Sequence, residues 1–151
     1  MDCCKNKQVR LEEWMPLIRE TLAAGQSVEF SPRGTSMLPM LRQGVDQVVL
    51  SPLPERLKKY DLPLYQRKNG QYVLHRILRV GESITCMGDN QFIPESGLQE
   101  SQMIGLVTAF YRGDKKIPVT DRRYWLYCRL WHKSRPVRRA WWWLKSKLRR
   151  H

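Results

Sequence analysis

The sequence predicts a mainly β (α+β) fold: a partly rolled antiparallel sheet, an N-terminal helix, and one or two basic, aromatic helices at the C-terminus. Apolar residues recur at helical spacing near both ends of the chain, and short β-prone segments fill its middle. At 151 residues the chain is long enough for one domain with a hydrophobic core. We therefore expect a packed N-terminal helix over 1–27, a β domain over 28–120 and a helical tail over 121–151.

The N-terminal helix is predicted over residues 9–24. Gly25 offers a natural stop for it, whereas Pro16 counts against a regular helix, because an interior proline kinks a helix unless it lies in the first turn. The expected packing face is apolar at positions i, i+3, i+4, i+7 and i+11: Leu11, Trp14, Met15, Ile18 and Leu22.

Short runs rich in Val, Ile, Leu, Tyr and Thr predict the strands of the β domain. Turn residues separate some of these runs, at 68–70 and at 80–83. Strands so closely spaced favour an antiparallel sheet. The expected strands cover 27–30, 47–50, 62–67, 71–80, 83–87, 104–111 and 116–120.

The tail carries most of the positive charge. Residues 121–151 hold eleven Lys and Arg against one acid, Asp121, and so account for +10 of the net charge of +13. Pro136 is expected to separate two helices. Their apolar faces contain Tyr124, Tyr127, Cys128 and Trp131 in the first helix, and Val137, Ala140, Trp141, Leu144 and Leu148 in the second.

Five of the six tryptophans also lie in this tail: Trp125, Trp131, Trp141, Trp142 and Trp143. Tryptophan and leucine on one side of a helix with cations around them are typical of a segment that binds an anionic membrane surface. For Trp125 and Trp131, packing on the β domain is an equal alternative. Base stacking and phosphate contacts would instead give a nucleic-acid partner, which we rank lower because the chain has no recognised nucleic-acid motif.

No apolar run approaches the roughly 18–20 residues that span a bilayer, and the first residues lack the apolar core of a signal peptide. We therefore expect a protein that stays in the cytoplasm or on the cytoplasmic surface of the membrane as a peripheral protein. The cysteines do not favour zinc or disulfides, because Cys3 and Cys4 are adjacent while Cys86 and Cys128 stand alone. No metal and no cofactor is expected.

One segment carries candidate chemistry, Arg-Gly-Thr-Ser-Met-Leu-Pro at 33–39. Gly34 permits a sharp turn, and Pro39 prevents the continuation of a ladder strand. Ser36 could then present its hydroxyl while nearby backbone N–H groups face a developing oxyanion. Taken alone, this segment is more often a turn with a capping serine than a catalytic element.

A serine nucleophile needs a base, and His75 lies within an apolar run at 72–78. Histidine has a reference pKa of about 6.5 and is mostly neutral at pH 7, although a lone histidine in a strand is usually a core or edge residue. An acid can hold the imidazole tautomer, and Asp89 in Gly-Asp-Asn and Glu95 after Pro94 are the candidates.

Together, Gly34-Thr35-Ser36-Met37-Leu38-Pro39, His75-Arg76-Ile77 and Gly88-Asp89-Asn90 resemble the signal peptidase I superfamily, which includes the SOS-repressor autoproteases, over roughly residues 28–112. The resemblance implies a rolled antiparallel sheet of the signal peptidase type. It also implies Ser36 as nucleophile and His75 as base, where most bacterial members have lysine. That Ser–His pair is similar to the signal peptidases of the endoplasmic reticulum and archaea.

The same resemblance implies that Asp89 or Glu95 supports His75, and we rank Asp89 slightly ahead. Substrate contacts are assigned to Gly34, Thr35 and Met37. The chain departs from the family because it lacks the usual N-terminal transmembrane anchor, and Gly34 leaves a mostly backbone oxyanion hole. Self-cleavage fits poorly because the lysine base is missing.

The predicted function is a serine endopeptidase that cleaves an extended leader or signal-like segment through an acyl-enzyme. The alternative is a nucleic-acid- or peptide-binding module on the same fold, without catalysis.

Overall fold

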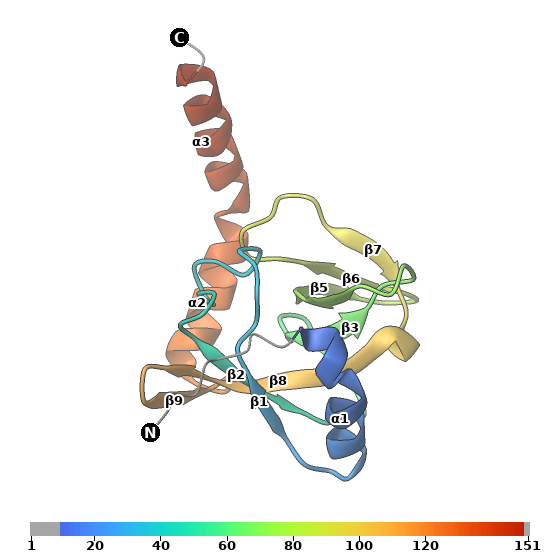
Figure 1. Ribbon diagram of the computed structural model, residues 1–151. Coiled ribbons are helices and arrows are strands. Elements are labelled where there is room, and N and C mark those ends of the chain that lie inside the picture. The colour runs from blue at the N-terminus through green and yellow to red at the C-terminus, as the bar shows by residue number, and fades with distance from the viewer. Residues whose placement is uncertain (1–9, 150–151) are drawn as a thin grey trace.

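The computed structural model describes residues 10–149, which form a mixed α+β structure with two antiparallel sheets (Figure 1). The helices are α1 (Leu11–Ala23), α2 (Arg122–Lys133) and α3 (Arg135–Leu148), with a short 3₁₀ helix at Glu100–Gln102. The strands are β1 (Val28–Phe30), β2 (Gln47–Ser51), β3 (Pro63–Gln66), β4 (Tyr72–Leu74), β5 (Arg76–Val80), β6 (Ile84–Met87), β7 (Glu95–Leu98), β8 (Met103–Arg112) and β9 (Lys115–Pro118).

The larger sheet has the strand order β1-β2-β8-β3-β4, with β9 paired to β8, and the smaller sheet has the order β5-β6-β7. The expected antiparallel pairing is confirmed, but the strands are divided between two sheets. The predicted strand 71–80 is interrupted at His75, and its two halves, β4 and β5, belong to different sheets. His75 thus lies where the chain passes from one sheet to the other.

Strand β7 has no counterpart among the predicted strands. Its sequence, Glu-Ser-Gly-Leu, shows neither β-branched residues nor a clear alternation, so local propensity does not reveal it. Pairing with β6 creates the strand, with Ile84 opposite Leu98 and Cys86 opposite Glu95. This pairing brings Glu95 to the smaller sheet beside the site described below.

Helix α1 confirms the prediction for 9–24 in its described part, with Pro16 inside the helix. Met15, Ile18 and Leu22 are buried in the main core, as their spacing predicts. Trp14 is different, because 47% of its surface stays exposed.

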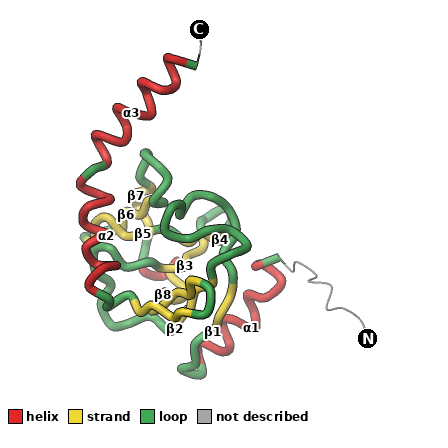
Figure 2. Tube along the Cα trace, turned by 90° about the vertical axis from the view of Figure 1, so that its left-hand side faces the viewer, coloured by secondary structure: helices red, strands yellow, loops and turns green. Residues whose placement is uncertain are grey.

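The tail forms two helices, and Pro136 lies in the first turn of α3, as predicted. Asp121 caps the N-terminus of α2, because its carboxylate accepts hydrogen bonds from the backbone N–H groups of Arg123 (2.8 Å) and Tyr124 (3.3 Å). Tyr124 and Cys128 anchor α2 in the main core. Helix α3 instead projects beyond the sheets (Figures 1 and 2).

The two tryptophans of α2 differ in their contacts. Trp131 is half-buried, and its indole N–H donates to the carbonyl oxygen of Asp89 (2.8 Å), whereas Trp125 is 51% exposed. Packing on the β domain therefore holds for Trp131 only. None of the helices within residues 10–149 is long and apolar enough to cross a membrane.

Candidate active site

The Ser36 segment forms an irregular turn between β1 and β2. Gly34 has a positive φ of 91°, a conformation that favours glycine, and its N–H donates to the side-chain oxygen of Gln43 (3.0 Å). Met37 is buried (5% exposed) and fixes the turn to the main core. Ser36 lies half-buried between exposed Thr35 and this anchor.

A second turn, residues 88–91, packs against the Ser36 segment and is hydrogen-bonded to it. The Asn90 backbone N–H donates to the Ser36 carbonyl (2.8 Å), and the Asn90 side-chain amide donates to the Thr35 carbonyl (3.2 Å). A Cβ atom on Gly88 would lie 2.5 Å from the Ser36 carbonyl oxygen and 3.0 Å from Ser36 Cβ. Only glycine at position 88 therefore allows this approach without a shift of Ser36.

His75 is 4% exposed, and its Nδ1 lies 3.3 Å from the hydroxyl oxygen of Tyr65. The Tyr65 hydroxyl in turn donates to Glu95 Oε2 (2.7 Å). Burial and the neighbouring Glu95 raise the pKa of Tyr65, so the phenol keeps its single proton. Since that proton points to Glu95, Nδ1 of His75 must carry hydrogen and donate to Tyr65. Nε2 of His75 is then the atom with the free lone pair.

No hydrogen bond within residues 10–149 engages Nε2 of His75. His75 is only 4% exposed, but it lines a small pocket of the structure.

Electrostatics keep His75 neutral. Burial, with the positive charge of Arg67 adding to it, lowers the pKa of His75 to about 4. Arg67 itself donates two hydrogen bonds to Glu95, from Nε to Oε1 (2.9 Å) and from Nη2 to Oε2 (2.8 Å). Burial alone would raise the pKa of Glu95, but hydrogen bonds from Arg67 and Tyr65 outweigh it and lower the pKa. At pH 7 the imidazole is therefore uncharged beside a charged Arg67–Glu95 pair.

Ser36 and His75 line one pocket of about 240 Å³, together with Gly34, Met37 and Arg67. Thr35 is not among the lining residues. No hydrogen bond joins the Ser36 hydroxyl to His75 in this part of the chain, so the pocket places the two side chains together without connecting them directly.

A larger groove of about 1020 Å³ adjoins this pocket, and the two share Pro32, Arg33, Tyr72 and Leu74. Residues of β1 and β4 both line the groove. These strands are the two ends of the larger sheet's strand order, so each has an edge without a strand partner among residues 10–149. An extended chain in the groove would meet unpaired backbone groups next to Ser36.

Asp89 is fully buried, and its carboxylate serves a different partner. Arg76 donates to it twice, through Nε to Oδ1 and Nη2 to Oδ2, both at 2.8 Å. Tyr127 (3.0 Å) and His132 (3.2 Å) of α2 also contact it. Burial would raise the pKa of Asp89, but Arg76 lowers it to about 2.

No hydrogen bond among the described residues joins Asp89 to His75. Asp89 therefore fastens α2 to turn 88–91, whereas Glu95 reaches the imidazole through Tyr65. The structure thus gives no support for ranking Asp89 ahead of Glu95 as the partner of His75, and the proposal below reverses that order.

Sequence reasoning missed Tyr65 and Arg67. Both lie in the predicted strand 62–67, two residues apart, and this spacing puts their side chains on one face. The two side chains gain a role at the site only through Glu95 of β7, which contacts both of them in the folded structure. Cys86 is buried, and burial raises the pKa of its thiol to about 12, which does not suit a nucleophile; Cys3 and Cys4 lie outside the described residues.

Residues 10–149 contain no cluster of three or more His, Cys, Asp or Glu side chains able to hold a metal ion. Comparison with protein-family models, curated proteins and solved structures found no match. The functional assignment therefore rests on the geometry of this site and on its motifs.

Proposed function

We propose that the chain is a serine endopeptidase of the signal peptidase type, with Ser36 as nucleophile and His75 as general base. The observation that carries the proposal is the shared pocket of Ser36 and His75, which adjoins a groove lined in part by the edge strands β1 and β4. The resemblance of the Ser36, His75 and Asp89 segments to the signal peptidase superfamily supports it, and a rolled sheet of that type is the finer fold proposed.

The tautomer of His75 suits a general base. Nδ1 is occupied by Tyr65, so Nε2 is the atom that takes the Ser36 proton as the hydroxyl oxygen attacks the scissile carbonyl carbon. The imidazolium that forms is positive, and the carboxylate of Glu95 beyond Tyr65 stabilises it. Glu95 is therefore the proposed acid partner, acting through Tyr65, and Asp89 is a positioning residue for the turn that supports Ser36.

The reaction then follows an acyl-enzyme course. The tetrahedral intermediate collapses, the C–N bond breaks, and His75 returns its proton to the departing amine. Water next attacks the Ser36 ester, and His75 takes a proton from the water and gives it back to Ser36. The backbone N–H of Ser36 makes no hydrogen bond within residues 10–149, which leaves it as a candidate oxyanion donor.

The groove suits an extended peptide. A substrate strand could pair with the free edge of β1 or β4, while Val28, Phe30 and Leu74 offer apolar contacts for its side chains. An extended leader or signal-like segment is the substrate class that such a groove favours. Main-chain pairing would supply affinity, and the small pocket beside Gly34 and Met37 would select the residue at the scissile bond.

The test is cleavage of a library of extended peptides by the full chain and by Ser36→Ala. The variant deletes one oxygen from a half-buried turn, so we expect unchanged thermal unfolding and loss of cleavage on the order of 10⁴–10⁶ in kcat. Ser101→Ala, at an exposed serine far from the pocket in sequence, is the matched control and should cleave as the natural chain does. Cleavage by Ser36→Ala within tenfold of the natural chain would refute the nucleophile.

A non-catalytic peptide-binding module remains the second candidate, because Ser36 and His75 share no hydrogen bond and the low pKa of His75 makes it a weak base. Saturable peptide binding without turnover, unchanged in Ser36→Ala, would favour it.

A further inference from the structure

Helices α2 and α3 share one exposed apolar stripe. Its members follow one another at intervals of three, four or seven residues, which keeps them on one helical face. They are Leu126 (50% exposed), Leu130 (59%), Val137 (71%), Trp141 (60%), Leu144 (46%) and Leu148 (69%), called here the tail stripe.

The helical register continues across the boundary between α2 and α3. Ser134, between them, has φ −77° and ψ −1°, which is a helical conformation. Its N–H donates to Leu130 O (2.9 Å), and its carbonyl accepts from the Arg138 N–H (3.0 Å). Residues on either side of Ser134 therefore belong to a single stripe.

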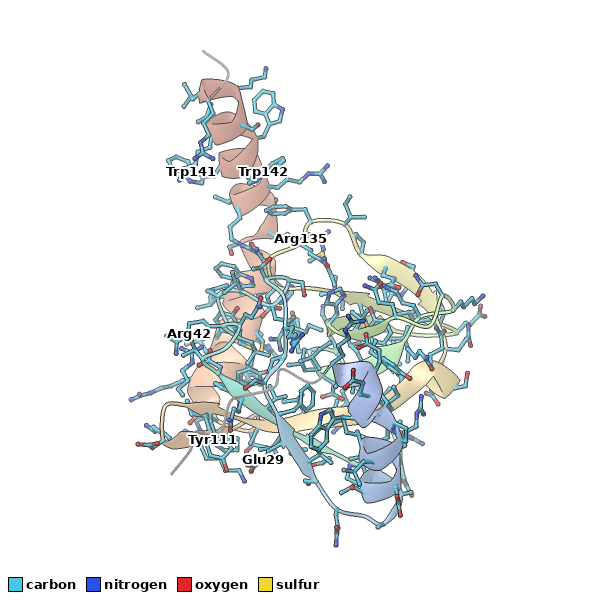
Figure 3. The ribbon with its side chains drawn as sticks, viewed as in Figure 1. Glu29, Arg42, Tyr111, Arg135, Trp141 and Trp142 are labelled. Carbon is cyan, nitrogen blue, oxygen red and sulfur yellow. The ribbon has the colours of Figure 1, made fainter. Side chains whose placement is uncertain are left out.

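The fold does not use this stripe. Helix α2 packs through Tyr124 and Cys128, which lie on another face. Helix α3 meets the rest of the molecule through Arg138, 3.4 Å from Asp89 O, and Trp142, whose ring lies 6.2 Å from that of Phe92. In Figure 3, Trp141 and Trp142 lie on the projecting part of α3, and Arg135 lies nearer the sheets.

Cations surround the stripe. Helix α3 has no acidic residue and five cationic ones: Arg135, Arg138, Arg139, Lys145 and Lys147. Several cations lie over tryptophan rings, with Arg129 3.8 Å from Trp125, Lys147 4.0 Å from Trp143 and Lys145 5.3 Å from Trp141. Any partner of this surface must accept apolar side chains and positive charge together.

We propose that the tail stripe binds the surface of an anionic lipid bilayer, with α3 lying in the headgroup region. Leucine and tryptophan enter the boundary between headgroups and acyl chains, while the surrounding lysines and arginines meet anionic headgroups. A second copy of the chain would place positively charged helices without acidic residues against each other, and their charges would repel. A nucleic acid would accept the positive charge but would leave Leu144 and Leu148 exposed to water. A bilayer satisfies both parts of the surface, and the proposal does not depend on the peptidase assignment.

The experiment uses the full chain with vesicles of equimolar phosphatidylglycerol and phosphatidylcholine, and with vesicles of phosphatidylcholine alone. We expect co-sedimentation with the anionic vesicles, weakened by added salt, and a blue shift of tryptophan fluorescence. Trp141→Ser with Leu144→Ser should weaken vesicle binding at least tenfold. The matched control removes the same residue types at the same spacing from α1, Trp14→Ser with Leu17→Ser (47% and 52% exposed), and should bind as the natural chain does.

All four side chains are well exposed, and circular dichroism confirms that each variant is folded. A second variant, Lys145→Gln with Lys147→Gln, should weaken binding to anionic vesicles and leave the stripe intact. Equal binding by the stripe variant and the control, or no vesicle binding by the natural chain, would overturn the proposal. Two further results would also overturn it. One is binding of duplex DNA with an affinity that the stripe variant leaves unchanged, together with no vesicle binding. The other is a lipid-free dimer that the stripe variant abolishes.

Discussion

His75 and Arg76 are neighbours in the sequence but belong to two different side-chain clusters. Each cluster contains an arginine–carboxylate ion pair, and the two pairs differ in burial. The Glu95 cluster (Tyr65, Arg67, His75 and Glu95) borders the pocket, and the side chains of Arg67 and Glu95 are 31% and 27% exposed. The Asp89 cluster (Arg76, Asp89, Tyr127 and His132) lies beneath α2, and its Arg76–Asp89 pair is completely buried.

The difference in burial separates a structural role from a chemical one. A buried carboxylate–guanidinium pair cannot lose one partner without leaving an uncompensated charge, so the Asp89 cluster holds α2 and turn 88–91 in place. A partly exposed pair tolerates such a change and can still shift the pKa of an adjacent group. The Glu95 cluster is therefore placed to tune His75, and the predictions below test that division of roles.

The largest expected effect concerns the two histidines. His75→Gln keeps the size of the side chain and removes the base, so kcat should fall on the order of 10⁴-fold while thermal unfolding changes little. The matched control is His132→Gln in the Asp89 cluster, which should keep activity within tenfold at a temperature where it is folded. Comparable activity in the two variants would remove His75 from the mechanism.

The two acids should differ in stability. Asp89→Asn leaves Arg76 buried without a charged partner and should lower the free energy of unfolding by about 3–5 kcal/mol, measured by denaturant titration. Glu95→Gln breaks a partly exposed pair and should cost about 1 kcal/mol or less. Among folded molecules, Glu95→Gln should reduce cleavage more than Asp89→Asn. The opposite order in both measurements would restore Asp89 as the acid partner of His75.

The contact between Gly88 and Ser36 should matter for rate. In Gly88→Ala the added methyl would lie 2.5 Å from the Ser36 carbonyl oxygen, so the nucleophile must move. A displacement near 1 Å costs on the order of 10²-fold in kcat. Gly81→Ala is the control, because its Cβ would lie 3.9 Å from Ser83 O, an ordinary van der Waals contact. Unchanged kcat in folded Gly88→Ala would show that turn 88–91 does not position Ser36.

The smallest effect is a shift of the pH profile. The proposed base, His75, would act in its neutral form, so we expect activity to rise as pH increases through the pKa of His75, which burial lowers from the reference value of about 6.5 to about 4. Arg67→Gln removes a positive charge that lowers this pKa and frees the negative charge of Glu95 to raise it. The rising limb should therefore move to higher pH in initial-rate measurements. A limb at the same pH in both proteins would separate the Glu95 cluster from the base.

Elements with local signals were predictable from sequence. The helical spacing around Ile18 and the position of Pro136 predicted α1 and the two tail helices, because the backbone hydrogen bonds of a helix join residues close together in the sequence. Strand β7 escaped prediction because it exists through pairing with β6. The interruption at His75 also depends on the separation of two sheets, which no local pattern records.

The candidate site was likewise predictable where a local motif marks its residues and not where it depends on strand pairing. Ser36 and His75 were found through motifs, and the structure places them in one pocket. The choice between Asp89 and Glu95 as partner of His75 depended on which arginine each acid pairs with in three dimensions. Asp89 pairs with Arg76, the residue next to His75 in the sequence, and Glu95 pairs with Arg67. Tyr65 could not be assigned at all, because its role as a link requires both β3 and β7.

The most direct test of the central claim is covalent labelling of the full chain with a fluorophosphonate probe, followed by mass spectrometry of the intact chain and its peptides. An activated serine attacks phosphorus and displaces fluoride, which leaves one adduct on its oxygen. We predict a single adduct on Ser36, absent in Ser36→Ala and formed much more slowly in His75→Gln. No adduct on the natural chain, or labelling of Ser36→Ala at the same rate, would contradict the assignment of Ser36 as a nucleophile activated by His75.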